Sequence, residues 1–238
     1  MTDFGKIKDY AAFVQQDPFR NGLHYPAVVQ ELGDVKKRIL DVGCGDGRFP
    51  RILAAQGASV VGYDMAAEKI DEAKAVEHAH PLHIQYGVAT PQTFSINEKF
   101  DAATSVLVLP YAPSVDELRS FFRSTCSQLV EGGKFVSIIF NPSFSAFGED
   151  LGSRRFTKLN EHDVQVEFLD PESHATKFTS VLHPYSQEHY QQAAENEGFR
   201  STQWKTLHAT QEAIQTLGEK FWDKCHREQP YAVLITHK

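Results

Sequence analysis

The sequence predicts an α/β fold in which a mostly parallel sheet lies between two layers of helices. The first observation is the run 38–55, RILDVGCGDGRFPRILAA, where an apolar strand, a glycine-rich turn and an amphipathic helix follow one another directly. The second is that strand-like and helix-like segments keep alternating along the chain. Parallel strands need such crossover helices, so this order favours a parallel sheet with helices on both faces.

The turn within this run predicts a nucleotide-binding site. Gly43, Gly45 and Gly47 follow the strand at alternate positions. Glycine lets the backbone turn tightly and lets a ligand approach where a Cβ atom would block it. A dinucleotide fingerprint has the spacing G-x-G-x-x-G, but here the spacing is G-x-G-x-G and Arg48 occupies the place of the last glycine. This spacing disfavours a nicotinamide cofactor.

Two acids beside the turn indicate the charge of the ligand. Asp41 lies at the end of the strand, and we expect Asp46 at the N-cap of the helix, where it would accept hydrogen bonds from free N–H groups. An anion at that position repels a pyrophosphate, which binds at the same end of a helix. The acids suit a cofactor with a cationic end, and S-adenosylmethionine, with its ammonium and sulfonium groups, is one.

The later segments continue the alternation. A β-branched strand, 58–64, ends in Asp64, which is placed to accept both ribose hydroxyls of a nucleotide or is an ordinary strand-end acid. An amphipathic helix with Val115, Leu118 and Phe122 on one face separates strands expected at 99–109 and 130–140. Beyond residue 140, the runs RRFTKL, VQVEFL and TKFTSVL alternate like exposed antiparallel strands. We further expect helices at 26–33, 187–197 and through Ile214, Leu217, Phe221 and Trp222, and strands at 200–208 and 231–236.

The runs DVGCGDG, VVGYD and VEGGKFV resemble the motifs of the class I S-adenosylmethionine-dependent methyltransferases, and the likeness covers nearly the whole chain. DPFRNGLHYP, LVLPYAPSVDEL, YQQAAENEGF and the closing QEAIQTLGEKFWDKCHREQPYAVLI are similar to a narrower group of small bacterial enzymes that includes toxoflavin N-methyltransferase. The resemblance implies a three-layer Rossmann-like methyltransferase fold: a mostly parallel seven-stranded sheet with an antiparallel last strand, plus a small β cap. It implies a single domain, 1–238, with a helical lid at 1–35 and a cap insertion at 141–185.

The resemblance also implies a donor site for S-adenosylmethionine, which leaves as S-adenosylhomocysteine. In this group the Arg of a P-x-R pattern, here Arg20, pairs with the methionine carboxylate; an ion pair of Arg20 with Asp17 is the alternative. Val88 stands where relatives carry an adenine-binding Asp, so backbone groups near Val88 and Ala89 are expected to take over. The expected cofactor contacts are Tyr10, Arg20, Asp41, Gly43, Cys44, Gly45, Asp64, Met65, Val88, Ala89, Ser105 and Val106.

The acceptor side gives fewer signals. The sulfonium methyl is already activated, so in-line transfer to nitrogen or oxygen needs mainly alignment at about 3–3.5 Å. We expect Tyr25, Tyr111 and Asn141 to line the acceptor pocket, with core packing as the alternative. His24, Tyr111 and His183 are the candidate catalytic groups, and a structural or merely exposed role is the alternative for each histidine. The Asn-Tyr-Ala of relatives is Pro-Tyr-Ala here, at 110–112.

Composition excludes several classes of partner. A net charge of −7 argues against nucleic acid, and the basic stretches 36–38 and 154–155 are short; we expect the second to be a solvated loop, or to meet an anionic substrate. No apolar run approaches the roughly 18 residues of a membrane span, and the start lacks a secretion pattern. Three scattered cysteines indicate reduced thiols and no metal site. These features predict a cytoplasmic monomer or homodimer that acts on a small molecule.

Two other functions stay open at this level. The chain could be a non-catalytic protein that binds S-adenosylmethionine or S-adenosylhomocysteine on the same fold, because fold alone does not imply catalysis. A NAD-dependent oxidoreductase is disfavoured by Asp46, Arg48 and the glycine spacing.

Overall fold

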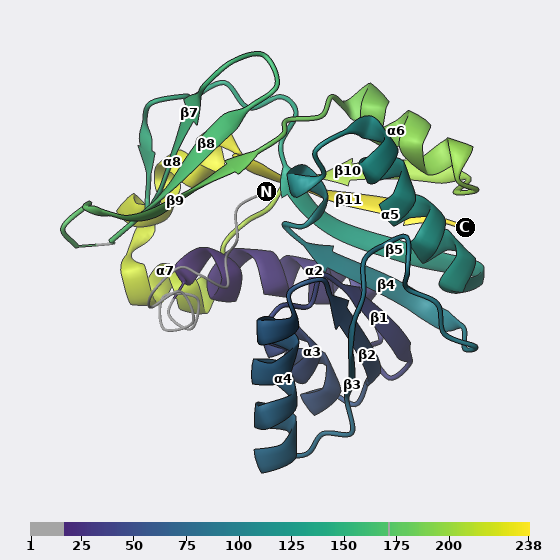
Figure 1. Ribbon diagram of the computed structural model, residues 1–238. Helices are drawn as coiled ribbons and strands as arrows, with labels where there is room; N and C mark the ends of the chain where they lie inside the picture. The colour runs from purple at the N-terminus through teal and green to yellow at the C-terminus, as the bar shows by residue number, and fades with distance from the viewer. Residues whose placement is uncertain (1–16, 171) are drawn as a thin grey trace.

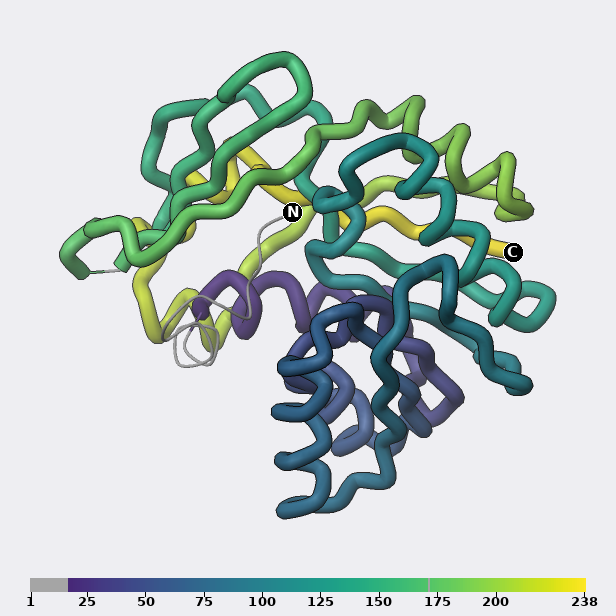
Figure 2. The backbone as a smooth tube through the Cα atoms, viewed as in Figure 1, coloured from purple at the N-terminus to yellow at the C-terminus, as the bar shows by residue number. Residues whose placement is uncertain are grey.

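The computed structural model describes residues 17–170 and 172–238, and it contains two sheets (Figures 1 and 2). The larger has seven strands in the order β10-β11-β5-β4-β1-β2-β3, and β11 alone runs antiparallel to its neighbours β10 and β5. Its strands are β1 (Arg38–Val42), β2 (Ser59–Asp64), β3 (Gln85–Val88), β4 (Phe100–Val106), β5 (Leu129–Phe140), β10 (Ser201–Lys205) and β11 (Tyr231–His237). This arrangement confirms the predicted fold class.

Helices cover both faces of this sheet. Helices α5 (Val115–Gln128) and α6 (Gln187–Asn196) lie together on one face (Figure 1), while α2 (Tyr25–Leu32) and α3 (Arg48–Ala55) pack on the other. Successive strand residues serve opposite faces: Ile39 packs with the α2 and α3 side chains, and Leu40 with those of α5 and α6. Helix α4 (Ala67–Ala79) packs beside β2 and β3. The three-layer arrangement therefore follows from strands that are apolar on both sides.

Segment 141–185 forms the second sheet, an antiparallel one, as expected. Its strands are β6 (Asp150–Leu151), β7 (Arg154–Lys158), β8 (Val164–Leu169) and β9 (Thr176–Leu182). One face packs against the end of the large sheet, where Phe156 meets Phe140 at 5.3 Å, Phe144 at 5.2 Å and Tyr231 at 5.8 Å between ring centroids. The cap therefore shares an aromatic core with the main sheet.

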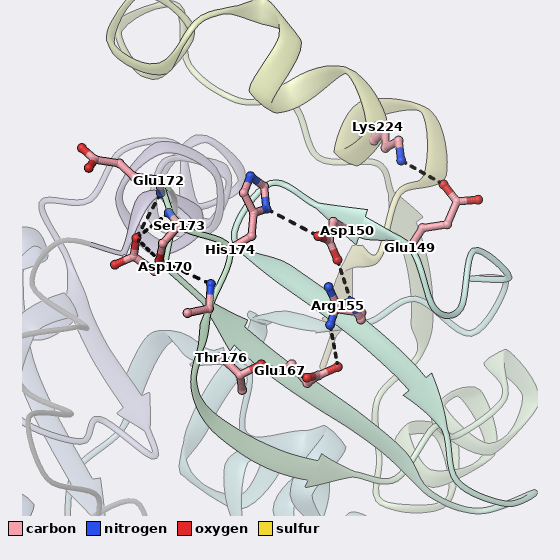
Figure 3. Close-up of polar contacts among 11 residues, drawn as sticks. Glu149, Asp150, Arg155, Glu167, Asp170, Glu172, Ser173, His174, Thr176 and Lys224 are labelled. Carbon is pink, nitrogen blue, oxygen red and sulfur yellow. Dashed lines mark hydrogen bonds and ion pairs between the residues drawn. The ribbon is translucent and has the colours of Figure 1, made fainter.

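The other face of the cap is charged (Figure 3). Arg155 on β7 contacts Asp150 at 2.6 Å and Glu167 at 3.5 Å, and His174 lies 3.4 Å from Asp150. Beside β6, Glu149 pairs at 3.2 Å with Lys224 of α8 (Glu219–Glu228), which ties the cap to the C-terminal part of the chain. Exposed pairs of this kind add little stability each, so the aromatic face carries most of the attachment.

Three local expectations were wrong. The helix expected through Ile214 and Trp222 is two helices, α7 (Gln211–Leu217) and α8, because Gly218 between them has φ +81°. The strand expected to reach residue 109 ends at Val106, and Leu109–Tyr111 forms a 3₁₀ turn around Pro110. Gly47, not Asp46, caps α3; the Asp46 carboxylate accepts a 3.3 Å hydrogen bond from Arg48 N.

The short helix 26–33 is confirmed as α2, which follows a π-helical turn, Arg20–His24. The three cysteines, Cys44, Cys126 and Cys225, are buried and form no disulfide. Within residues 17–170 and 172–238, none of the helices has both the length and the apolar character needed to cross a membrane.

Trp222 anchors the C-terminal helices to the core, and its removal tests this packing. The side chain is fully buried, contacts Phe19 and Phe221, and donates from Nε1 to the carbonyl oxygen of Ala213 at 3.1 Å. Trp222→Ala is expected to lower the free energy of unfolding by about 3–5 kcal/mol in urea titrations. Trp204→Ala, on the half-exposed face of β10, is the control and should cost clearly less; equal losses would contradict this placement.

Candidate active site

A cavity of about 590 Å³ opens at the carboxyl ends of β1, β2 and β4, between the large sheet and the cap. That volume is typical of small-molecule sites, and this edge of an open α/β sheet is where ligands bind. The lining groups come from the glycine turn, the start of α4, the segments after β3 and β4, the Arg20–Tyr25 region, and strands β7 and β8.

The glycine turn has a geometry that only glycine satisfies at its first position. Gly43 has φ +71°, and an added Cβ would lie 2.4 Å from Val108 Cγ2. Its N–H and that of Cys44 both donate to the carbonyl oxygen of Tyr63 at the end of β2, at 2.8 and 3.0 Å. The turn is therefore held against the neighbouring strand, with its backbone facing the cavity.

Asp64 fixes two loops at once. Its Oδ2 accepts a hydrogen bond from Gly45 N and its Oδ1 from Ala66 N, both at 2.9 Å. A carboxylate has about four lone-pair positions, so both oxygens keep capacity for ligand hydroxyls. The acid at the tip of β2 thus orders the glycine turn and the start of α4 around the place where it would meet a ligand.

Asp41 is buried beneath the turn. Its Oδ1 accepts a 2.7 Å hydrogen bond from the Thr104 hydroxyl. Burial raises the pKa of Asp41 to about 7, and the nearby charge of Asp64 adds to the rise while the Thr104 hydrogen bond opposes it. The carboxyl can therefore change charge near neutral pH. Burial likewise raises the pKa of the Cys44 thiol beside it.

Two arginines also line the cavity. Arg20 and Arg154 line it, and both approach the buried carboxylate of Asp17: Arg154 Nη2 lies 2.5 Å and Arg20 Nε 3.6 Å from Asp17 Oδ2. Arg154 was expected in a solvated loop, and that expectation was wrong. It lies on β7 with only 1% of its side chain exposed, because strand alternation turns it inward and the adjacent Arg155 outward.

Most of the expected cofactor contacts lie around the cavity. Those that line it are Arg20, Asp41, Gly43, Cys44, Gly45, Asp64, Met65, Ala89 and Val106. Val88 does not, since its side chain is 53% exposed on the edge strand β3, and Ser105 is buried within β4. Tyr10 lies outside the described residues.

The expected acceptor and catalytic residues divide similarly. Tyr25 and Tyr111 line the cavity, and Tyr25 stacks on Phe49 at 4.8 Å. Asn141 does not line it; its amide donates to the carbonyl oxygen of Gln229 at 2.7 Å and accepts from Ser143 N at 3.0 Å.

Neither candidate histidine lies at the cavity wall. His183 pairs with Asp163 at 2.9 Å beside the cap. His24 is fully buried against Tyr231, with a ring separation of 4.5 Å, and within the described part of the chain neither of its ring nitrogens has a hydrogen-bond partner. Burial lowers the pKa of His24 well below its ordinary value, and the charges of Arg154 and Arg20 lower it further.

Lys69 and Phe168 are among the lining residues that sequence reasoning did not select, and Arg154 was considered only as part of a solvated loop or as a contact for an anionic substrate. Lys69 on α4 is 7% exposed and lies 2.9 Å from Glu72, at a helix position that reads as an ordinary surface pair. Arg154 could have been found, because it lies two residues before an apolar Phe in the strand RRFTK and therefore shares its inward face. Across the described ranges, no group of three or more His, Cys, Asp or Glu side chains is arranged to hold a metal ion.

Known proteins match this chain in sequence and in fold. Residues 10–203 match the methyltransferase domain family. The ubiquinone biosynthesis O-methyltransferase of Pelagibacter ubique is 32% identical over 139 residues, 56% of each chain, and that of Coxiella burnetii is 30% identical over 129 residues, 53% of each chain. The chain thus spans about half the length of the curated relatives it matches.

Solved structures share the architecture over most of their length. An S-adenosylmethionine-dependent methyltransferase from Mesorhizobium loti aligns with a TM-score of 0.65 at 20% identity, over 94% of this chain and all of its own. An amino pentose methyltransferase from Micromonospora echinaspora, solved with S-adenosylmethionine bound, aligns with a TM-score of 0.68 at 18% identity, over 97% of this chain and 96% of its own. At these identities the likeness shows the fold alone.

His24 should destabilise the folded protein in weak acid. Because the folded pKa of His24 is lowered, the unfolded chain binds more protons below about pH 6.5, and stability falls as the pH drops through that value. His24→Phe removes the buried ring nitrogens, so we expect about 1 kcal/mol of added stability at pH 7 and a smaller loss between pH 6.5 and 5. His78→Phe, at an exposed site on α4, is the control. Parallel pH profiles for wild type and His24→Phe in urea titrations would refute this account.

Proposed function

Because the chain belongs to the methyltransferase domain family, we propose that it transfers the methyl group of S-adenosylmethionine to a nitrogen or oxygen of a small molecule. The observation that carries this proposal is the charge distribution of the cavity. Asp41, Asp46 and Asp64 line the cavity around the glycine turn, and the guanidinium of Arg20 lines the same cavity. S-adenosylmethionine carries two cationic groups and one carboxylate, which this distribution complements.

The donor fits these groups in one direction. Asp64 would accept hydrogen bonds from the ribose hydroxyls, with the adenine beside Ala89. The ammonium and sulfonium groups would lie near the glycine turn, above Asp41, and the methionine carboxylate would meet the guanidinium of Arg20. The methyl group would then face the part of the cavity closed by Tyr25, Tyr111 and the cap residue Phe168.

The chemistry follows from which groups line the acceptor end. Among the described residues, the carboxylates of the cavity come from β1, its turn, the end of β2 and the start of α4, all on the donor side, and no imidazole lines it. Burial raises the pKa of Tyr25, so that phenol stays protonated and donates hydrogen bonds. We therefore infer an acceptor that releases its proton to water without help from an enzymic base. Its lone pair forms the new bond to the methyl carbon as the carbon–sulfur bond breaks, leaving S-adenosylhomocysteine.

Two atoms of the acceptor are candidates for methylation, oxygen and nitrogen. The curated relatives are named as O-methyltransferases, which favours oxygen. The similarity to the group of toxoflavin N-methyltransferase favours nitrogen. The shared aromatic core of cap and main sheet supports a single domain in which 141–185 closes the acceptor end.

Two measurements test the function. S-adenosylhomocysteine should raise the melting temperature of the protein, and NADH should leave it unchanged. Transfer of labelled methyl from S-adenosylmethionine is then measured on a panel of phenols and of heterocycles with acidic N–H groups. Stabilisation by NADH alone would overturn the proposal in favour of an oxidoreductase. Binding of S-adenosylhomocysteine without transfer to any member of a broad panel would favour the non-catalytic alternative.

Asp64→Ala should weaken donor binding. The substitution removes charge-assisted hydrogen bonds worth roughly 1.5–3 kcal/mol each, so we expect the Kd for S-adenosylhomocysteine to rise about 10- to 150-fold in calorimetry. Asp71→Ala, at an exposed position of α4, is the matched control and should bind normally. An unchanged Kd for Asp64→Ala would remove the ribose contact from the proposal.

Donor binding should also depend on pH through Asp41. Its folded pKa of about 7 lies above that of the unfolded chain, so the stability it contributes is lost as the pH rises toward 7, when the buried carboxyl ionises. The ionised form attracts the cationic donor, so the affinity for S-adenosylmethionine should rise roughly tenfold between pH 6 and pH 8. Asp41→Asn should bind more weakly and show a flat profile. A wild-type profile that is already flat would rule out this role.

A further inference from the structure

We propose that Arg154 of the cap is a positioning residue: by neutralising the buried carboxylate of Asp17, it leaves the guanidinium of Arg20 at the cavity, where it holds the carboxylate of the donor. The inference rests on the donor placement under the proposed function. It assigns to the cap, the part of the fold expected to select the acceptor, a role in binding the donor.

Arg154 is held too tightly to act as a mobile cation. Nη1 donates to the carbonyl oxygen and Oγ of Ser153 at 2.9 and 3.1 Å, and Nη2 donates to Asp17 Oδ2 at 2.5 Å. The guanidinium carbon lies 4.9 Å from the ring centroid of Phe19 and 4.3 Å from that of Phe168. Aromatic faces on a fully buried guanidinium fix its plane as well as its position.

Asp17 is the group that both arginines share. Its side chain is completely buried, and Oδ1 accepts a 3.2 Å hydrogen bond from Phe19 N at the turn that leads into Arg20–His24. Oδ2 lies 2.5 Å from Arg154 and 3.6 Å from Arg20. The shorter contact shows which cation compensates the buried charge.

The consequence of losing Arg154 follows from the cost of a buried, unpaired carboxylate. That cost is large, and among the described residues Arg20, three residues along the chain, is the other cation that contacts Asp17, at 3.6 Å. Asp17 would then draw the Arg20 guanidinium away from the cavity. Arg154 thus acts through Arg20, across a separation of more than 130 residues in sequence.

The pair of adjacent arginines on β7 supplies the experiment with its control. Arg154→Met removes the inward guanidinium, and Arg155→Met removes the outward one, which contacts Asp150 and Glu167 on the charged face of the cap (Figure 3). The probes are S-adenosylhomocysteine, which carries the carboxylate, and 5′-methylthioadenosine, which lacks the amino-acid part. Calorimetry measures the Kd of each.

We expect Arg154→Met to raise the Kd of S-adenosylhomocysteine at least tenfold and to leave the Kd of 5′-methylthioadenosine at its wild-type value. Arg155→Met should change neither Kd. The double variant Asp17→Asn/Arg154→Met removes the buried charge that captures Arg20, so it should restore the Kd of S-adenosylhomocysteine to within about threefold of wild type. Equal weakening of both probes by Arg154→Met, or a double variant no better than the single one, would overturn the proposal, because damage to the fold predicts both results.

Two further variants separate this proposal from the proposed function. If Arg154→Met does not fold, Arg154→Gln replaces it: the guanidinium charge is lost while amide hydrogen bonds are retained, so the binding of S-adenosylhomocysteine alone should weaken, and unchanged binding would count against the proposal. Arg20→Gln should likewise weaken the binding of S-adenosylhomocysteine and leave that of 5′-methylthioadenosine unchanged. Normal binding of S-adenosylhomocysteine by Arg20→Gln overturns the positioning role and leaves the methyltransferase proposal standing, whereas a wild-type protein that binds neither probe overturns both.

Discussion

The attachment of the glycine turn to the end of β2 is the constraint on which the site depends. The carbonyl oxygen of Tyr63 and the carboxylate of Asp64 together receive backbone N–H groups from Gly43, Cys44, Gly45 and Ala66. Two loops that belong to different crossover units are thereby fixed to one strand tip. The same contacts bring Asp41 and Asp64 within electrostatic reach of each other, so this attachment also positions the acidic residues of the cavity.

The second constraint is the charge buried at the far end. The buried carboxylate of Asp17 contacts the guanidinium of Arg154. That guanidinium lies over the ring of Phe19, near the start of the described chain, and over the ring of Phe168 in the cap. A charged group that crosses between elements in this way is costly to bury, so it specifies which elements meet more than it adds to stability. The aspartates and arginines that line the cavity thus come from different parts of the chain: the aspartates from the large sheet and its loops, and the arginines from the Arg20–His24 turn and from β7.

The fold could be predicted almost entirely from the sequence, because its signals are local. Strand 38–42, the glycine turn and the following helix are adjacent in the chain, and periodicity marks the remaining elements. The boundaries that were wrong depend on single backbone conformations, such as the positive φ angles of Leu107 and Gly218, which leave little trace in a hydrophobic pattern. The acidic residues of the cavity could be predicted for the same reason: Asp64 ends β2, and Asp41 lies one residue before the end of β1.

The remainder of the cavity lining could not be predicted as well, since it is assembled from segments far apart in sequence, from Arg20 to Phe168. Asn141 donates a hydrogen bond to the carbonyl oxygen of Gln229, His24 packs against Tyr231, and His183 contacts Asp163; none of the three lines the cavity. The cap and the main sheet share one aromatic core, in which Phe156 contacts the rings of Phe140, Phe144 and Tyr231. The cap therefore does not pack as an independent unit. To exchange this segment for another, evolution or an engineer would also have to change the matching rings of the main sheet. Single substitutions among the cap residues that line the cavity, such as Phe168, leave those ring contacts in place and are therefore the simpler way to alter the cavity.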